Sequence, residues 1–172
     1  MHLLHPSFLL FVLSSANTVS AQVAAPATVP LERGQWVHVD KSDRLLRLMQ
    51  DEKEVARFRI ALGRQPVGQK RQEGDNRTPE GRYLLDYRNP NSGYFKSIHI
   101  SYPTAEQRRQ AKARSMDPGG LVMIHGQKNG FGGLAAITQR FDWTYGCIAL
   151  DNIDMQTLWD ALELPVPIRI DP

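Results

Sequence analysis

Cysteine is almost absent from this sequence, since Cys147 is the only one among its 172 residues. A single cysteine cannot form an internal disulfide, so no disulfide framework holds the fold. No cysteine stands near the start of the chain either, which excludes lipidation at an N-terminal cleavage site. The roles left for Cys147 are a buried inert thiol, a disulfide between two chains, or a functional thiol.

Metal ligands are also few. Only three histidines follow residue 21, at positions 38, 99 and 125. Neither they nor the lone cysteine show the short HxxxH or CxxC spacing that is typical of zinc ligands. The sequence therefore predicts a protein without a metal site and without a cofactor.

Long apolar runs are missing as well. The apolar run at residues 8–13 is far shorter than the roughly 20 residues that a membrane-spanning helix needs. Small residues stand just before position 22, as in a cleaved export signal, although the segment starts without Lys or Arg. We expect a signal peptide at residues 1–21, a flexible leader at 22–33, one domain at 34–172, and a periplasmic location.

The excess of positive charge is small, with a net charge of +3. Lys and Arg are spread among acidic residues and form no basic stripe, so the chain is not expected to bind nucleic acid. A mildly basic protein suits an anionic polymer such as a cell wall. The sequence contains no internal repeat and no second block of composition, and we expect a monomer.

The pattern of apolar and polar residues predicts a mixed, mainly β domain with a few short helices. A polar loop rich in Gly and Pro occupies residues 63–81, and loops of this length inside a domain are often functional. The three segments before it are expected to form a β-meander, and three more strands are expected after it. The expected strands are 36–40, 45–49, 55–62, 82–87, 97–102 and 168–170.

Two helices are expected in the second half of the chain. Residues 104–107 have the sequence of a capping box and begin a polar helix that ends near Arg114. The second helix covers residues 153–162 and is capped by Asp151 or Asn152. The residues expected on its inward face are Ile153, Leu158 and Leu162.

The residues that carry chemistry gather in residues 122–150. An apolar run there ends on His125 and Gly126, and Cys147 follows Gly146. A thiol with a pKa of about 8.5 is mostly protonated at neutral pH, so a nucleophilic cysteine needs a base or a positive charge nearby. A strand–loop–strand return would bring the imidazole to the thiol, and Gly126 would leave room for a substrate and expose carbonyls that fix the imidazole tautomer. The alternative is a buried cysteine and an unrelated histidine.

Glycine at position 146 adds a second feature. It permits unusual backbone angles, which would let the peptide N–H groups around Gly146 and Cys147 point together at a developing oxyanion.

A set of short motifs surrounds these residues. The chain reads His125-Gly126, a variable loop, and then Thr144-Tyr145-Gly146-Cys147 followed by Ile148-Ala149. Together with the further motifs, this combination resembles the L,D-transpeptidase catalytic (YkuD-type) domain, and within it the YafK-like branch. The family pattern is His-Gly, a loop, and Ser/Thr-His-Gly-Cys followed by an apolar residue and usually Asn or Arg. The further motifs lie at residues 39–42, 60–63, 74–81, 100–103, 117–120 and 142–144.

The resemblance implies a β-sandwich or barrel-like domain with Cys147 as nucleophile and His125 as base. Backbone N–H groups near Tyr145, Gly146 and Cys147 would then form the oxyanion hole. Enzymes of the family attack the carbonyl of a diaminopimelate residue in a peptidoglycan stem peptide and form a thioester. Transpeptidases pass the acyl group to an amine on another stem or on a lipoprotein lysine, whereas some relatives hydrolyse and detach the lipoprotein.

Two positions depart from the family pattern. Tyr145 replaces the motif histidine, and Ala149 replaces the usual Asn or Arg. A phenol with a pKa of about 10 is a weaker proton carrier at neutral pH than an imidazole, so the acceptor side of the reaction is altered. We therefore expect hydrolytic release of a peptidoglycan-linked lipoprotein, with transpeptidation as the nearest alternative. A non-catalytic peptidoglycan-binding domain is the alternative from another class.

Substrate-binding residues are the least specified by the sequence. We name His99, Arg82, Tyr83 and Trp143 as candidates near the expected groove. His99 alternates with apolar neighbours in its strand, so it is either a solvated strand residue or a residue that lines the groove.

Overall fold

The computed structural model describes Met1 and residues 34–172. The expected signal peptide and leader lie outside the described residues. None of the helices in the described part has the length and apolar composition needed to cross a bilayer.

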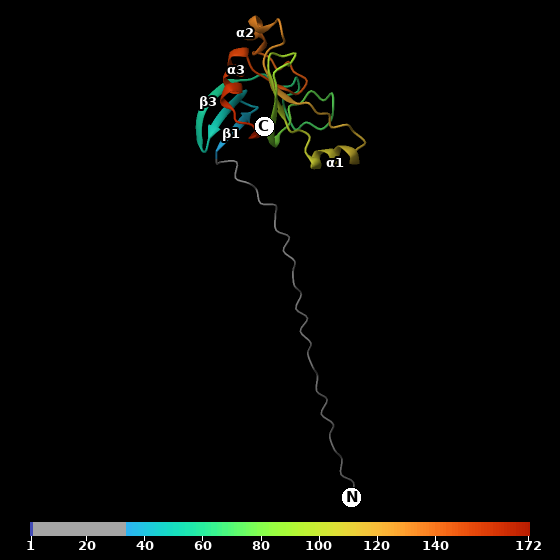
Figure 1. The fold of residues 1–172 in the computed structure, drawn as a ribbon. Helices are drawn as coiled ribbons and strands as arrows, with labels where there is room; N and C mark the ends of the chain where they lie inside the picture. Colours follow the sequence, from blue (N-terminus) through green and yellow to red (C-terminus); the bar gives the residue numbers. More distant parts are fainter. Residues whose placement is uncertain (2–33) are drawn as a thin grey trace.

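The described residues form a mainly β unit with short helices, as the sequence predicts (Figure 1). Three short helices and one 3-10 turn accompany eight strands. The helical elements are α1 (Ala105–Ala113), η1 (Gly132–Leu134), α2 (Ala135–Thr138) and α3 (Asn152–Ala161). The strands are β1 (Gln35–Asp40), β2 (Leu45–Gln50), β3 (Lys53–Arg59), β4 (Gly81–Asn89), β5 (Ser97–Ile100), β6 (Met123–His125), β7 (Ile148–Ala149) and β8 (Val166–Asp171).

All eight strands belong to one sheet with the order β3-β2-β1-β8-β4-β5-β6-β7. The first three strands form the predicted antiparallel meander. The last strand of the chain, β8, lies between β1, to which it is parallel, and β4, to which it is antiparallel. Strands β6 and β7 form the second parallel pair, at one edge of the sheet.

The two ends of this strand order meet just beyond β3. Ala61 and Ala149 exchange two backbone hydrogen bonds of 2.8 Å each, and Gly63 bridges to Thr144. The sheet therefore curls toward a barrel-like shape, which confirms the predicted fold. The third predicted strand ends at Arg59 and not at residue 62, because the residues after it turn to pair with β7.

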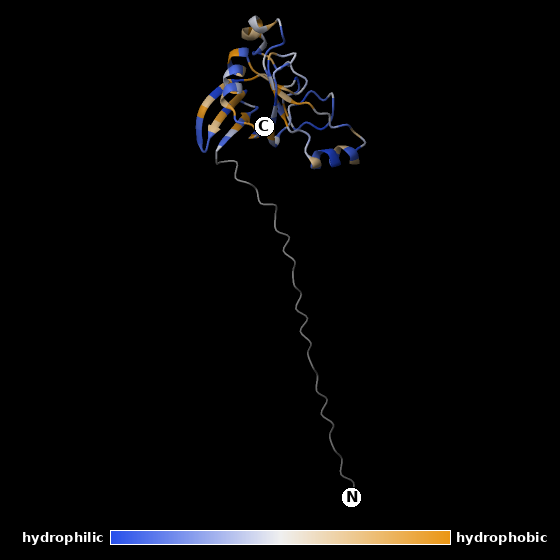
Figure 2. Cartoon of the chain, in the orientation of Figure 1, coloured by the Kyte–Doolittle hydropathy of each residue, from blue (hydrophilic) through white to orange (hydrophobic). Residues whose placement is uncertain are grey.

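The core lies inside the curled sheet and beneath α3. Apolar and polar residues alternate along the strands, while α1 is mostly hydrophilic in Figure 2. Thr104 caps α1, and its side chain and that of Gln107 form the predicted capping box. The largest fully buried side chains are Leu46, Ile60, Leu62, Leu85, Ile98, Ile100, Ile124, Ile148, Leu150, Met155, Leu158 and Leu162.

One predicted core residue of α3 is wrong. Ile153 is 79% exposed, and Met155 is fully buried in its place. The helix begins at Asn152 with Asp151 as its cap, and its buried stripe runs through Met155 and Leu158. Since each residue advances about 100° around a helix, Ile153 lies about 200° from Met155 and faces solvent.

Candidate active site

Strands β6 and β7 bring His125 and Cys147 to the same side of the sheet. Ile124 pairs with Ile148 and His125 with Ala149, in parallel register, and both isoleucines are fully buried. Successive side chains of a strand point to opposite faces, so His125 and Cys147 both lie on the face away from these isoleucines. Both residues line one pocket. The expected strand–loop–strand return is therefore present.

The His125 ring is oriented by the backbone that follows it. It is 5% exposed, and its Nδ1 lies 2.7 Å from the carbonyl oxygen of Gly126. A carbonyl oxygen can only accept, so Nδ1 carries a proton and donates it, and Nε2 of the neutral ring keeps its lone pair. The rings of Tyr94 and Trp143 pack on the imidazole at centroid distances of 4.7 and 5.7 Å. The imidazole is thus held in the tautomer that a general base needs.

Gly126 is closely surrounded by other residues. From the sequence we expect it to leave space for a substrate, and the structure does not show that space. A Cβ added there would lie 2.7 Å from Asn152 Oδ1 and 2.9 Å from Cβ of Phe95. The same Asn152 oxygen accepts a hydrogen bond from the Gln127 N–H at 2.8 Å. Glycine is therefore required at this position by packing.

The Cys147 thiol is half-buried and stands immediately before β7, beside the first residue of β6. Its Sγ accepts a hydrogen bond from the Met123 N–H at 3.4 Å, and its S–H faces the Leu121 carbonyl oxygen at 3.9 Å. The N–H bond favours the thiolate, whereas the carbonyl contact is available only to the thiol.

Burial sets the protonation of both groups in the resting site. It lowers the pKa of His125, against a smaller opposing effect of the hydrogen bond to Gly126. Burial also raises the pKa of Cys147, and the Met123 N–H and the positive charge of Lys70 act in the opposite direction. At neutral pH the pocket therefore holds a neutral imidazole and a neutral thiol, and the thiol proton must move when the nucleophile attacks.

Residues 144–147, here called the nucleophile turn, are fixed by one threonine side chain. Thr144 Oγ1 donates to the Cys147 carbonyl oxygen at 2.7 Å and accepts from the Gly146 N–H at 3.1 Å. Gly146 has φ +129°, and a Cβ there would lie 2.7 Å from the Arg77 carbonyl oxygen. Glycine is the residue type that adopts this conformation without strain, as the sequence suggests.

The three N–H groups expected to form an oxyanion hole are not equivalent. The Gly146 N–H is bonded inside the turn to Thr144. Within residues 34–172, the N–H groups of Tyr145 and Cys147 have no hydrogen-bond acceptor. These two are the donors available to a substrate oxygen.

The pocket around the pair has a volume of about 430 Å³. Trp143, a predicted substrate-binding residue, lines it and packs on His125. Tyr145 projects from the turn with 69% of its surface exposed, and the Arg64 guanidinium lies 4.6 Å from the centroid of its ring. The lining residues are Arg64, Ser92, Tyr94, Ser97, Leu121, Met123, His125, Trp143, Thr144, Tyr145 and Cys147.

The other three predicted substrate-binding residues are not in this lining. His99 Nδ1 forms a hydrogen bond with Asp86 Oδ1 at 2.7 Å, and its ring stacks on Tyr87. Arg82 is exposed on β4, and Tyr83 is buried with its hydroxyl donating to the Glu80 carbonyl oxygen. The structure brings together only Trp143 of the four with the Cys–His pair.

Several pocket residues were not foreseen from the sequence. Tyr94 belongs to the connection between β4 and β5, and Arg64 to the polar loop. Arg64 reaches the site because its N–H donates to the Thr144 carbonyl oxygen at 3.0 Å, across the seam where the sheet closes. The length of the loop was the only signal in the sequence that pointed to it.

A comparison with known protein families identifies the family of the chain. The model of the L,D-transpeptidase catalytic domain (YkuD) matches residues 34–170. The chain belongs to this family. No protein with a curated description matches the YkuD chain in sequence.

Three solved structures illustrate the similarity of this YkuD domain to known folds. The helical cell shape determining protein Pgp2 from Campylobacter jejuni is 25% identical, with a TM-score of 0.63, over 80% of this chain and 47% of Pgp2. Bd1075 from Bdellovibrio bacteriovorus is 22% identical, with a TM-score of 0.57, over 81% of this chain and 48% of Bd1075. An L,D-transpeptidase from Xylanimonas cellulosilytica is 15% identical, with a TM-score of 0.55, over 81% of this chain and 61% of that structure's chain. The last two share the fold, and the chain spans about half the length of the first two proteins.

Proposed function

We propose that this chain is an exported cysteine acyl-transfer enzyme that acts on peptidoglycan stem peptides through a thioester at Cys147. The observation that carries the proposal is the Cys147–His125 pair on one pocket wall, with the imidazole tautomer fixed by Gly126. Membership of the YkuD family supports the substrate class. A periplasmic location follows from the expected signal peptide and from the site of this substrate.

The chemistry begins with transfer of the thiol proton to Nε2 of His125. The thiolate sulfur attacks the carbonyl carbon at diaminopimelate, and the Tyr145 and Cys147 N–H groups donate to the resulting oxyanion. When the tetrahedral intermediate collapses, the bond to the leaving amine breaks. The imidazolium returns its proton to that amine, and an acyl thioester remains on Cys147.

Water is the acyl acceptor that we propose for the second step. His125 removes a proton from water, the hydroxide attacks the thioester, and the free carboxylate and the thiol are regenerated. Two features support water over an amine: the replacement of the motif histidine by Tyr145, and the exposed position of that ring at the pocket rim. The leaving amine in this proposal is the lysine of a peptidoglycan-linked lipoprotein, so the reaction detaches the lipoprotein.

The experiment is mass spectrometry of sacculi incubated with residues 22–172, with and without attached lipoprotein. Hydrolysis predicts loss of lipoprotein or of terminal stem residues without new crosslinks. New crosslinks between diaminopimelate residues, or new lipoprotein attachment, would establish a transpeptidase. The Cys147→Ala variant is the control and should leave every product unchanged.

A binding domain without catalysis is excluded by the same experiment if products form. It would instead be supported by unchanged sacculi together with a Cys147 thiol that does not react with iodoacetamide.

A further inference from the structure

A buried positive charge lies behind the nucleophile turn. The Lys70 side chain is 5% exposed, and its Nζ donates to Asp75 Oδ1 at 2.8 Å and to the Gln72 carbonyl oxygen at 3.1 Å. Lysine is seldom buried unless it is paired. The pairing explains how the charge is tolerated here, but not why a lysine is placed at this point.

The Lys70 Nζ atom lies next to the backbone of the nucleophile turn. It lies 3.8 Å from the point that a Cβ on Gly146 would occupy. The neighbouring loop is pressed on the same residue, since a Cβ on Gly63 would lie 3.1 Å from the Gly146 Cα. The ammonium therefore faces the backbone of the residue that precedes Cys147.

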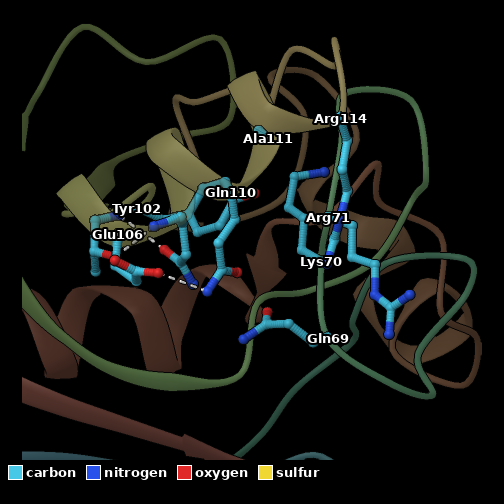
Figure 3. A pocket seen from close by; sticks show the side chains of 10 residues that line it. Gln69, Lys70, Arg71, Tyr102, Glu106, Gln110, Ala111 and Arg114 are labelled. Carbon is cyan, nitrogen blue, oxygen red and sulfur yellow. Dashed lines mark hydrogen bonds between the residues drawn. The ribbon is translucent and has the colours of Figure 1, made fainter.

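Lys70 also reaches a second pocket. Figure 3 shows it in the wall of a pocket of about 420 Å³, together with Arg71 and Arg114. Both arginines are exposed, whereas Lys70 is buried. The Lys70 side chain thus lies between this pocket and the back of the nucleophile turn.

Few other charges act on the sulfur. The titratable or charged side chains that line the pocket with Cys147 are Arg64, Tyr94, His125 and Tyr145. Arg64 is exposed at the rim, where water screens its charge, and burial keeps His125 neutral. The carboxylate of Asp75 shares its charge with three backbone N–H groups as well as with Lys70. Among the described residues, Lys70 is the buried cation nearest to the turn.

We propose that Lys70 is a positioning residue whose ammonium, held by Asp75 against the back of Gly146, stabilises the negative charge that develops at Cys147 during acyl transfer. The proposal rests on the proposed function and deepens it. A neutral thiol that must lose its proton in a buried site gains from a fixed positive charge nearby, because the low dielectric strengthens the attraction. The cation acts through the field at the turn and does not contact the substrate.

The test is the pH dependence of alkylation of Cys147 by iodoacetamide, which reports the thiolate and needs no substrate. Lys70→Met keeps the length of the side chain and removes its charge. We expect the apparent pKa of the thiol to rise by about one unit, which lowers the alkylation rate at neutral pH about tenfold. Lys70→Arg should restore most of the rate.

Lys41 provides a matched control. It is 2% exposed, pairs with Glu80 at 2.7 Å, and donates to the carbonyl oxygens of Gly68 and Thr78 in the same loop. Lys41→Met should therefore lower the melting temperature without moving the alkylation profile. If Lys70→Met behaves in the same way, Lys70 only holds the loop and the proposal is overturned.

A second variant keeps the test decisive if Lys70→Met does not fold. Asp75→Asn removes the countercharge, so the apparent pKa of the thiol should fall, and an unchanged profile would contradict the proposal. The outcome is separate from that of the proposed function. If the Lys70 variants shift the alkylation profile as expected while the unsubstituted chain leaves sacculi unchanged, the Lys70 proposal stands and the proposed acyl-transfer function is contradicted.

Discussion

The guanidinium of Arg64 lies over the ring of Tyr145, 4.6 Å from its centroid. One residue comes from the polar loop and the other from the nucleophile turn, so the contact joins the two segments at the pocket rim. The ring, and not the hydroxyl, makes this contact.

The rim contact predicts different outcomes for two substitutions. Tyr145→Phe keeps the ring and should leave kcat/KM unchanged. Tyr145→Ala removes a contact worth about 0.5–1 kcal/mol at an exposed site and should raise KM about two- to fivefold. Steady-state kinetics on a stem peptide measures both, and the alkylation rate of Cys147 should be the same in the two variants. A large loss of kcat in Tyr145→Phe would give the hydroxyl a role in proton transfer.

The base assignment predicts a large loss on removing the imidazole. His125→Ala should lower the rate of thioester formation about 10²- to 10⁴-fold, since a positioned general base contributes that much. Intact-protein mass spectrometry after mixing with a stem peptide measures acylation. Cys147→Ser serves as the negative control. Near-normal acylation in His125→Ala would contradict the pairing.

The lowered pKa of His125 predicts how activity and stability change with pH. The base is active when neutral, so the acid limb of kcat/KM should lie below the ordinary histidine range. For stability, the unfolded chain binds the proton more readily than the folded chain. The contribution of this residue is therefore present above the unfolded pKa and is lost as the pH falls toward the folded pKa. Thermal unfolding of wild type and His125→Gln at pH values between the folded and unfolded pKa measures this contribution. His125→Gln should reduce the dependence of stability on pH.

Two glycines offer a matched test of the nucleophile turn. Gly146→Ala introduces a Cβ 2.7 Å from the Arg77 carbonyl oxygen at φ +129°, which should destabilise the protein by about 1–3 kcal/mol and displace Cys147. Gly133→Ala meets no atom within 4 Å and should leave stability and activity nearly unchanged. Denaturant unfolding together with the alkylation rate distinguishes the two. An active, stable Gly146→Ala would mean that the turn relaxes easily.

Helix α3 offers a second matched pair. Leu158→Ala removes a fully buried side chain and should cost about 2–5 kcal/mol of unfolding free energy. Ile153→Ala, five residues earlier in the same helix and exposed, should change it by less than about 0.5 kcal/mol. Equilibrium urea unfolding checks both values. Comparable losses would place Ile153 in an intermolecular contact in solution.

Local signals in the sequence account for the elements that were predicted. The meander of β1, β2 and β3 follows from short-range alternation, and the start of α1 from the Thr104–Gln107 capping box. The Cys–His pair was foreseen because the chemistry of a thiol demands a base and only one histidine lies in the same stretch.

Long-range pairing accounts for most of what was missed. No local pattern tells that β8 inserts between β1 and β4, or that the segment after β3 pairs with β7 to close the sheet. Lys70 belongs to a loop that reads as polar; its partner Asp75 is local, but its approach to the Gly146 backbone joins segments far apart in the sequence. The wrong prediction for Ile153 has a different origin. Residues two positions apart in a helix point to nearly opposite sides, so placing the apolar stripe at Ile153 and not at Met155 assigns the wrong face to the core.

The exchange of hydrogen bonds between Ala61 and Ala149 has a consequence for folding. It joins the segment just after β3 to β7, next to the place where the loop that carries Lys70 meets the nucleophile turn. Contacts between distant parts of a chain form slowly because closing long loops costs entropy. Reactivity of the thiol should therefore appear last in refolding, after the secondary structure, and an incompletely folded chain would carry Cys147 without the surroundings that activate it.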